Sequence, residues 1–161
     1  MYKHWLKPTM PGKTSLARIY ANALNAEFHE LSAVDSGKED IKNVLGKKDA
    51  LQFDTRPKVL FIDEIHRFNK AQQDFLLPYV ESGELTLIGA TTENPSFEVI
   101  PALLSRSRVF ILNELSDADM RKIIKRTRFP LKKEATDWLI RMCNGDARQA
   151  LAMLENTHEL Y

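Results

Sequence analysis

The sequence has one cysteine, almost no net charge and no long apolar segment. Because Cys143 has no second cysteine to pair with, a disulfide within the chain is excluded, and we expect a reducing compartment. The formal net charge of +1 indicates no overall field that would attract nucleic acid or a membrane surface. No apolar run approaches the roughly 20 residues of a membrane-spanning helix. The 161 residues suffice for one compact domain, or for one domain with a small appendage.

The most informative stretch is Val59–Glu64, in which four apolar residues lead into two carboxylates. A short apolar run of this kind is typical of a strand that is buried on both faces. Carboxylates at the end of such a strand are costly unless something pairs with them. In a nucleotide-hydrolysing site, Asp63 would hold Mg²⁺ and Glu64 would orient and deprotonate the attacking water. The alternative is a strand that ends in two solvated acids.

A second motif is Gly12-Lys13-Thr14, which follows an expected strand at residues 2–6 and precedes apolar residues at helical spacing over 16–24. Strand, Gly-Lys-Thr and helix in this order are the context of a phosphate-binding loop. The N–H groups of the helix start would face phosphates. Lys13 would reach the β- and γ-phosphates, and Thr14 would ligate Mg²⁺. The alternative is a chance tripeptide in a turn.

The loop departs from the full phosphate-binding pattern. The glycine expected five residues before Gly12 is Lys7 here, and Pro11 has no N–H to donate to a phosphate. Met10 carries a Cβ where a left-handed turn costs about 1–2 kcal/mol. Each lost hydrogen bond to a charged group is worth about 1.5–3 kcal/mol. One or two such losses would weaken nucleotide binding by about tenfold to several-hundredfold.

Other patterns predict further strands at 28–33, 85–92 and 109–112. A capping box is predicted at Ser36-x-x-Glu39, and Asn69 is predicted to cap a helix that contains Pro78. His66 is expected to be structural or solvent-facing rather than a metal ligand, because no His or Cys lies at ligand spacing.

Polar residues follow two of these apolar segments. Thr91 and Thr92 end the strand at 85–92, beside which a γ-phosphate or attacking water could lie; the alternative is a threonine-rich strand exit. Arg106 and Arg108 form either a phosphate-sensing pair or an ordinary solvated turn.

From Leu115 onward the pattern is helical only, so a boundary is expected near Asn113-Glu114. The first of these helices and its exit are basic, which fits either nucleic-acid phosphates or a solvated face without interleaved aromatic residues. The basic residues are Arg121, Lys122, Lys125, Arg126, Arg128, Lys132 and Lys133.

Two longer runs carry a family resemblance: LFIDEIHRFNKAQQDFLLPYVESGELTLIGATTENPSFEVIPALLSRSR and NGDARQAL. They resemble AAA+ ATPases, and within them the replication-associated recombination protein A group, which includes the Werner-helicase-interacting ATPase. The resemblance implies an α/β fold of the P-loop NTPase type, with a parallel sheet flanked by helices over residues 1–114. A small all-helical lid over residues 115–161 would follow.

The resemblance also implies roles for individual residues. ATP and Mg²⁺ would be the ligands, with Asp63 as the metal-associated acid and Glu64 as the catalytic base. Thr92 would be the first sensor of the γ-phosphate. Arg106 would be an arginine finger for a neighbouring subunit, and Arg148 the second sensor. The remaining nucleotide-binding residues would be Gly12, Lys13, Thr14, Ser15 and Asn94.

The function implied is that of an ATP-hydrolysing protein that acts on DNA in replication-fork maintenance, recombination or repair. Its partners would be forked or single-stranded DNA, further copies of the chain, and replication or repair proteins. It would lie in the nucleus of a eukaryote, or in the cytoplasm or nucleoid of a bacterium. The alternatives are a catalytically degenerate interaction module and a clamp-loader-type subunit. Segments typical of the family before the first strand and after Tyr161 are missing, so we expect a fragment, a shortened paralogue or a faulty gene model.

Overall fold

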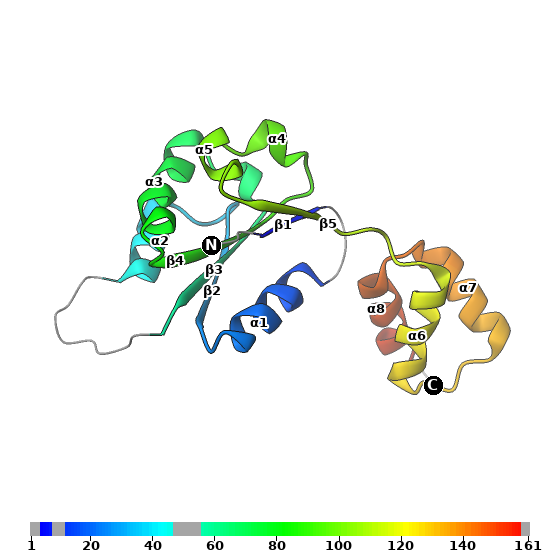
Figure 1. Cartoon of the computed structure of the whole chain (residues 1–161). Coiled ribbons are helices and arrows are strands. Elements are labelled where there is room, and N and C mark those ends of the chain that lie inside the picture. The colour runs from blue at the N-terminus through cyan, green and yellow to red at the C-terminus, as the bar shows by residue number, and fades with distance from the viewer. Residues whose placement is uncertain (1–3, 8–11, 47–55, 159–161) are drawn as a thin grey trace. The chain divides into compact units, whose positions relative to one another are not determined.

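The computed structural model describes residues 4–7, 12–46 and 56–158, and its contacts divide the chain into two compact units on either side of Leu112 and Asn113. The first unit contains a five-stranded parallel sheet in the order β2-β3-β4-β1-β5 (Figure 1). Its strands are β1 (His4–Lys7), β2 (Glu27–Ser32), β3 (Lys58–Asp63), β4 (Leu85–Ala90) and β5 (Arg108–Ile111). The predicted α/β fold with a parallel sheet is confirmed.

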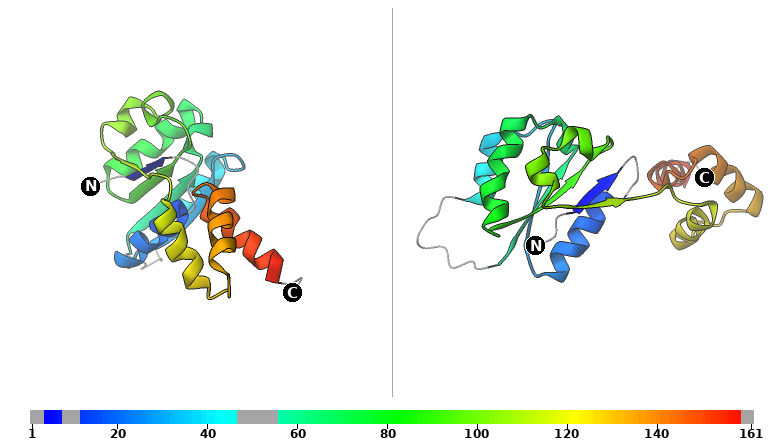
Figure 2. Two further views of the ribbon diagram at one scale, coloured as in Figure 1. Left: turned by 90° about the vertical axis from the view of Figure 1, so that its right-hand side faces the viewer. Right: turned by 45° about the horizontal axis from the view of Figure 1, so that its top comes forward.

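Helices cover both faces of this sheet (Figures 1 and 2). Successive residues of a strand point to opposite faces. Leu60 and Ile62 of β3 therefore pack with the helices of one face, whereas Val59 and Phe61 pack against α1 on the other. The helices of this unit are α1 (Lys13–Ala23), α2 (Lys38–Leu45), α3 (Lys70–Glu81), α4 (Pro95–Glu98) and α5 (Pro101–Leu104), together with a 3₁₀ turn at Ile65–Arg67.

The start of α2 differs from the prediction. The capping box expected from Ser36 is wrong, because the N–H of Ser36 donates to the carbonyl of Ser32 (2.9 Å) in the turn after β2. The helix begins one residue later. The N–H of Gly37 donates to the carboxylate of Asp40 (2.7 Å).

The start of α3 agrees with the prediction, because the side chain of Asn69 accepts a hydrogen bond from a backbone N–H of the first turn (2.9 Å). One turn further on, Gln73 is buried, and its amide nitrogen donates to the carbonyls of Phe68 (2.9 Å) and Glu98 (3.0 Å). The N–H of Ile100 donates to the Gln73 amide oxygen (2.9 Å). Gln73 thus joins α3 to the segment that follows β4.

The loop between β1 and α1 falls largely outside the described residues, and so do the predictions made for Met10 and Pro11. Lys7 is the last residue of β1 rather than part of that loop.

The second unit is a bundle of three helices: α6 (Asp117–Thr127), α7 (Lys133–Cys143) and α8 (Ala147–His158). Ser116 caps α6, whereas Arg128 and Asn144 end α6 and α7 in the left-handed conformation common at helix C-termini. The buried core is formed by Met120, Ile124, Leu139, Ile140, Cys143, Ala147, Ala150 and Leu154. The domain boundary predicted from the sequence lies two residues further along the chain than the division found in the contacts.

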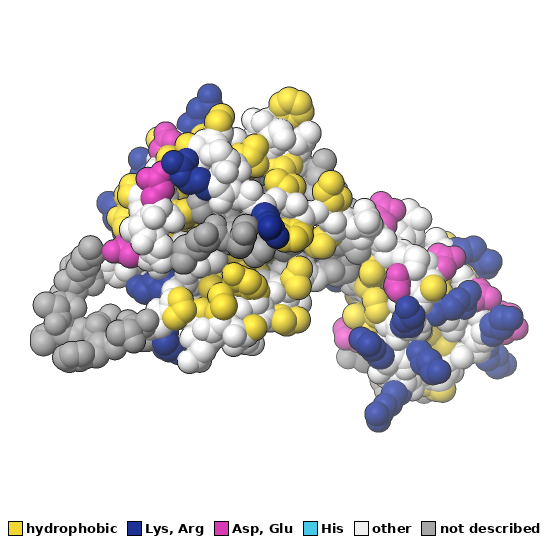
Figure 3. Space-filling model, in the orientation of Figure 1, with side chains coloured by type: hydrophobic (Ala, Val, Ile, Leu, Met, Phe, Trp, Pro, Cys, Tyr) yellow, Lys and Arg dark blue, Asp and Glu magenta, His cyan; other side chains and the backbone are white. Residues whose placement is uncertain are grey.

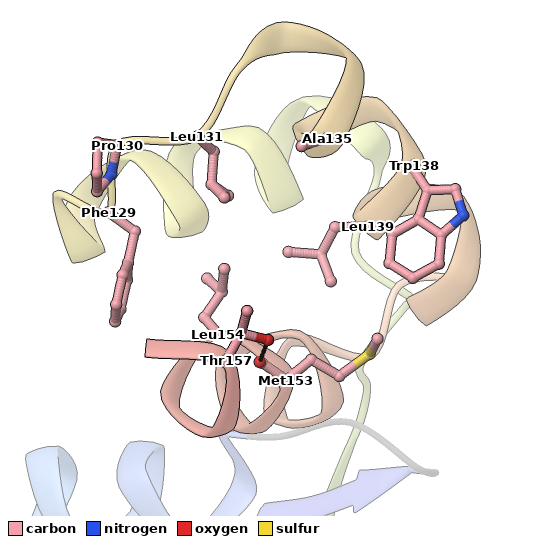
Figure 4. Close-up of a pocket in the computed structure, with 9 residues that line it drawn as sticks. All are labelled: Phe129, Pro130, Leu131, Ala135, Trp138, Leu139, Met153, Leu154 and Thr157. Carbon is pink, nitrogen blue, oxygen red and sulfur yellow. Dashed lines mark hydrogen bonds between the residues drawn. The ribbon is translucent and has the colours of Figure 1, made fainter. Parts of the chain in front are cut away.

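An apolar groove of about 340 Å³ lies in the helical unit, between the α6–α7 connection, α7 and α8 (Figure 4). Aliphatic side chains such as Leu131 and Leu139 line it. The one hydroxyl on its wall, that of Thr157, already donates to the carbonyl of Met153 (2.6 Å). The groove is therefore mainly apolar, and no charged side chain of the described residues lines it for a phosphate.

The first unit also exposes apolar side chains, over α1 and the edge strand β5 (Figure 3). Leu16, Tyr20 and Phe110 line a second groove there, of about 250 Å³. Among the helices in the described part of the chain, none is both long and apolar enough to cross a membrane.

Candidate functional site

The polar residues singled out in the sequence follow strands that are neighbours in the sheet. β4 lies between β1 and β3, with Ala90 opposite Leu6 and Gly89 opposite Ile62. Because the carboxyl ends of parallel strands meet at one edge, the acids after β3 lie beside the threonines after β4. This edge is the candidate site.

The start of α1 is suited to an anion. Gly12 precedes the helix with φ 124°, a conformation that favours glycine, and a Cβ there would meet no atom within 4 Å. The first turn contains no acidic residue, and no side chain among the described residues caps it. Lys13 is only 9% exposed, Thr14 is half-buried and Ser15 is exposed. The backbone N–H groups of this turn can therefore serve a phosphate.

Glu64 has an unusual backbone, which determines where its carboxylate points. It lies in the left-handed region (φ 51°, ψ 44°), which a non-glycine residue seldom adopts. Its N–H donates to the carboxylate of Asp63 (3.1 Å), and its carbonyl accepts from the N–H of Arg67 (2.8 Å). These bonds hold the turn directly after β3, and strained backbone of this kind is common at functional sites.

Two residues from different elements contact one oxygen of the Glu64 carboxylate. The hydroxyl of Thr92, which follows β4, donates to Oε2 (3.1 Å). Nδ1 of His66, in the 3₁₀ turn, lies 3.2 Å from the same oxygen. Glu64 is thereby held toward the end of β4, where the sequence places the first sensor.

The side chain of Asp63 is half-buried at the end of β3 and presents carboxylate oxygens, the ligand type that Mg²⁺ prefers. Among the residues that the structure describes, no group of three or more His, Cys, Asp and Glu side chains forms a metal site.

The neighbours of Thr92 make local contacts that shape the turn after β4. Thr91 is fully buried, and its hydroxyl oxygen accepts from the N–H of Glu93 (3.0 Å). Asn94 caps α4, since its side-chain oxygen accepts from the N–H of Ser96 (3.1 Å). The oxygen of Asn94 therefore has a structural task, and its predicted contact with nucleotide stays a prediction.

The predicted arginine finger, Arg106, and the predicted second sensor, Arg148, belong to segments later in the chain than Asp63 and Glu64. Arg106 follows α5, is about half exposed, and pairs with Glu81 at 3.0 Å while donating to the carbonyl of Ala102 (2.9 Å). Arg148 belongs to the helical unit, where it is exposed at the second position of α8. The roles assigned to both side chains stay predictions.

The basic residues expected along the helical unit are partly paired. Arg121 forms an ion pair with Asp137, and Lys122 with Asp119 at 3.1 Å. Figure 3 shows many Lys and Arg side chains on the visible face of this unit.

His66 is the site residue whose contacts the sequence did not predict. Its side chain is 6% exposed, so of the two positions expected for it the structure shows the structural one, and the solvent-facing one is wrong. Glu64 and His66 both follow β3, whereas Thr91 follows β4, so the contact between His66 and Thr91 depends on the pairing of these two strands. The one available signal was its place two residues after the predicted base.

Comparison with known proteins agrees with this geometry. The model of the "ATPase family associated with various cellular activities (AAA)" matches residues 8–116. Replication-associated recombination protein A of Escherichia coli K12 is 43% identical over 159 residues, which cover 92% of this chain and 36% of that protein. ATPase WRNIP1 of Dictyostelium discoideum is 48% identical over 155 residues, which cover 89% of this chain and 18% of that protein.

Among solved structures, the RuvB Holliday junction branch migration motor of Thermotoga maritima is similar in fold, with a TM-score of 0.78 and 29% identity. The similarity covers 98% of this chain and 54% of that one. The chain spans about a third or less of the length of replication-associated recombination protein A and of ATPase WRNIP1. The resemblance predicted from the two sequence runs is confirmed.

Proposed function

This chain belongs to the AAA family of ATPases, and from that membership we propose that it binds and hydrolyses ATP in the service of DNA replication, recombination or repair. The observation that carries the proposal is the Glu64 carboxylate, which follows Asp63 at the end of a buried strand and accepts from Thr92. A carboxylate oriented from the neighbouring strand end is the arrangement that activation of an attacking water needs.

We assign the phosphates of ATP to the start of α1. The N–H groups of its first turn and the Lys13 side chain would bind the β- and γ-phosphates. Support comes from the conformation of Gly12 and from the absence of acidic residues in the first turn. Ser15 and Asn94 are further candidates for nucleotide contact, the latter through its amide nitrogen.

We assign Mg²⁺ to the oxygens of Asp63 and the hydroxyl of Thr14. When bound, the ion would neutralise charge on the β- and γ-phosphates. The work of the chain itself is to hold the phosphates with Lys13, to take a proton from water with Glu64, and to orient that water with Thr92.

We further propose that the protein acts as a homo-oligomer in which Arg106 completes the site of the neighbouring copy. An arginine supplied in trans can be worth about 10³–10⁵ in turnover. The ion pair with Glu81 would be exchanged for the phosphate of the neighbour. Arg148 of the helical unit would contact the γ-phosphate and couple that unit to nucleotide, as a lid.

The proposed action on DNA rests on the names of the relatives, which refer to replication-associated recombination and to Holliday junction branch migration. These names favour forked or single-stranded DNA as the substrate class. Because DNA lies inside the cell, we also propose an intracellular location. Replication or repair proteins would be the further partners.

The experiment is phosphate release from ATP in Mg²⁺, with and without forked DNA, for the wild type, Arg106→Ala, Glu64→Gln and an equimolar mixture of the two variants. The proposal expects DNA-stimulated turnover in the wild type and little in either variant alone. It also expects partial recovery in the mixture, because an intact Glu64 then meets an intact Arg106. Wild-type turnover that equals that of Glu64→Gln would refute the proposed function. No recovery in the mixture would refute the shared site alone.

A further inference from the structure

We propose that His66 is a positioning residue that orients the carboxylate of Glu64. Nδ1 of its ring lies 3.0 Å from the hydroxyl oxygen of Thr91 and 3.2 Å from Oε2 of Glu64. The proposal rests on the function proposed above, since it concerns how the catalytic base is held.

The ring is held from several sides, which suits it to orient a neighbour. Its side chain is 6% exposed, and Thr91, on which Nδ1 rests, is fully buried. Nε2 faces the carboxylate of Glu93 at 3.6 Å. Glu93 itself is fixed to Thr91 by its backbone N–H (3.0 Å), so the ring sits in a frame provided by the turn after β4.

The protonation of the ring follows from its neighbours. We assign a ring hydrogen to Nδ1, because a lone pair there would face an ionised Glu64 carboxylate 3.2 Å away. Both the neutral Nδ1–H tautomer and the imidazolium supply it. A hydrogen on Nδ1 makes the 3.2 Å contact with the carboxylate oxygen favourable.

The consequence concerns the free oxygen of the base. The hydroxyl of Thr92 donates to Oε2, and Nδ1 of His66 lies 3.2 Å from the same oxygen, so Oε1 is the oxygen left to accept a proton from water. A carboxylate held by one neighbour can rotate, whereas two neighbours from separate elements restrict its plane. Because Thr92 follows β4 and His66 follows β3, the orientation of the base depends on the register of these two strands.

Kinetics provide the first test, with matched variants of the same histidine. His66→Ala removes the donor. His66→Asn places an amide nitrogen near the position of Nδ1, and His66→Gln places one near Nε2. We expect kcat of the alanine variant to fall by about 10- to 100-fold with KM within about twofold of wild type, since the lost interaction belongs to the transition state. The asparagine variant should recover most of the loss, and the glutamine variant little of it.

A second test does not depend on turnover. Unfolding by urea is measured for wild type, His66→Ala, Glu64→Ala and the double variant, and the cycle yields the coupling between the two side chains. The control cycle pairs Glu64→Ala with His29→Ala, since His29 lies on β2 and pairs with Glu27 at 3.0 Å. We expect coupling in the first cycle and additivity in the control.

Each outcome decides the matter. Coupling together with a selective loss of kcat that asparagine repairs supports the proposal. Additive effects of His66→Ala and Glu64→Ala on unfolding overturn the proposal, whatever turnover is measured. Coupling between them together with an unchanged kcat in His66→Ala also overturns it. A wild type that shows coupling but no turnover overturns the proposed function and the catalytic part of this proposal, while it establishes the contact.

Discussion

Replacement of Glu64 by glutamine separates the chemistry of this side chain from its place in the structure. The amide has nearly the same shape as the carboxylate, and its oxygen can still accept from the hydroxyl of Thr92, now 3.1 Å from Oε2. The backbone bonds that hold the turn, from Glu64 to Asp63 and from Arg67 to Glu64, are untouched. The substitution therefore removes the base and leaves the geometry.

The expected loss follows from the contribution of a general base. Such a group is worth about 10²–10⁴ in rate. At about 1.36 kcal/mol for each factor of ten, the barrier rises by about 3–5.5 kcal/mol. Folding should change by no more than about 1 kcal/mol, because the side chain is partly exposed and keeps an acceptor. ATP binding should be retained, since Glu64 is assigned no contact with phosphate.

The assay measures single-turnover phosphate release beside equilibrium binding of ATP and urea unfolding. A rate within tenfold of wild type would contradict the assignment of Glu64 as the base. Loss of ATP binding together with turnover would contradict the separation of chemistry from binding.

Three further predictions concern folding and reactivity. Gln73→Leu removes two buried hydrogen bonds and one partly buried hydrogen bond to backbone groups, so urea unfolding should show a loss of about 3 kcal/mol or more. Ser116→Ala removes the cap of α6, and unfolding should show a loss of about 0.5–2 kcal/mol. The Ser116 hydroxyl is also the main cause, ahead of Lys122, of the lowered pKa of Asp119. The stability that Asp119 contributes in the wild type is therefore present above the ordinary pKa of 3.8 and is lost as the pH falls through the lower pKa of the folded state. NMR titration of Ser116→Ala should show the pKa of Asp119 moving up. Burial raises the pKa of the Cys143 thiol, with nearby Asp146 adding to the effect, so a thiol reagent at pH 8 should label it only as the protein unfolds.

The sequence predicted the elements whose signal is local. The apolar run before Asp63 identified β3, and Asn69 identified the start of α3, because each depends on a few adjacent residues. Ser36 shows where local reasoning fails. Its pattern fits a cap, but the turn after β2 uses its N–H, and the helix starts from Gly37 instead.

The contacts of the site depend on the sheet and could not be predicted in this way. Thr92 reaches Glu64 across 28 positions of sequence, and His66 reaches Thr91 across 25. Both contacts exist because β3 and β4 are parallel neighbours in one register. The left-handed backbone of Glu64 has no sequence signal either, since such a conformation usually indicates glycine or asparagine.

Binding of ATP with Mg²⁺, measured by calorimetry on the purified chain, tests the central claim most directly. The control variants are Lys13→Ala, which removes the proposed phosphate contact, and Lys122→Ala, which removes an exposed lysine of the helical unit. The account predicts saturable binding in wild type and in Lys122→Ala, and binding weakened at least about tenfold in Lys13→Ala, as the loss of a charged hydrogen bond implies. Absence of binding up to millimolar ATP in a folded wild-type chain would contradict the account, as would equal binding by Lys13→Ala.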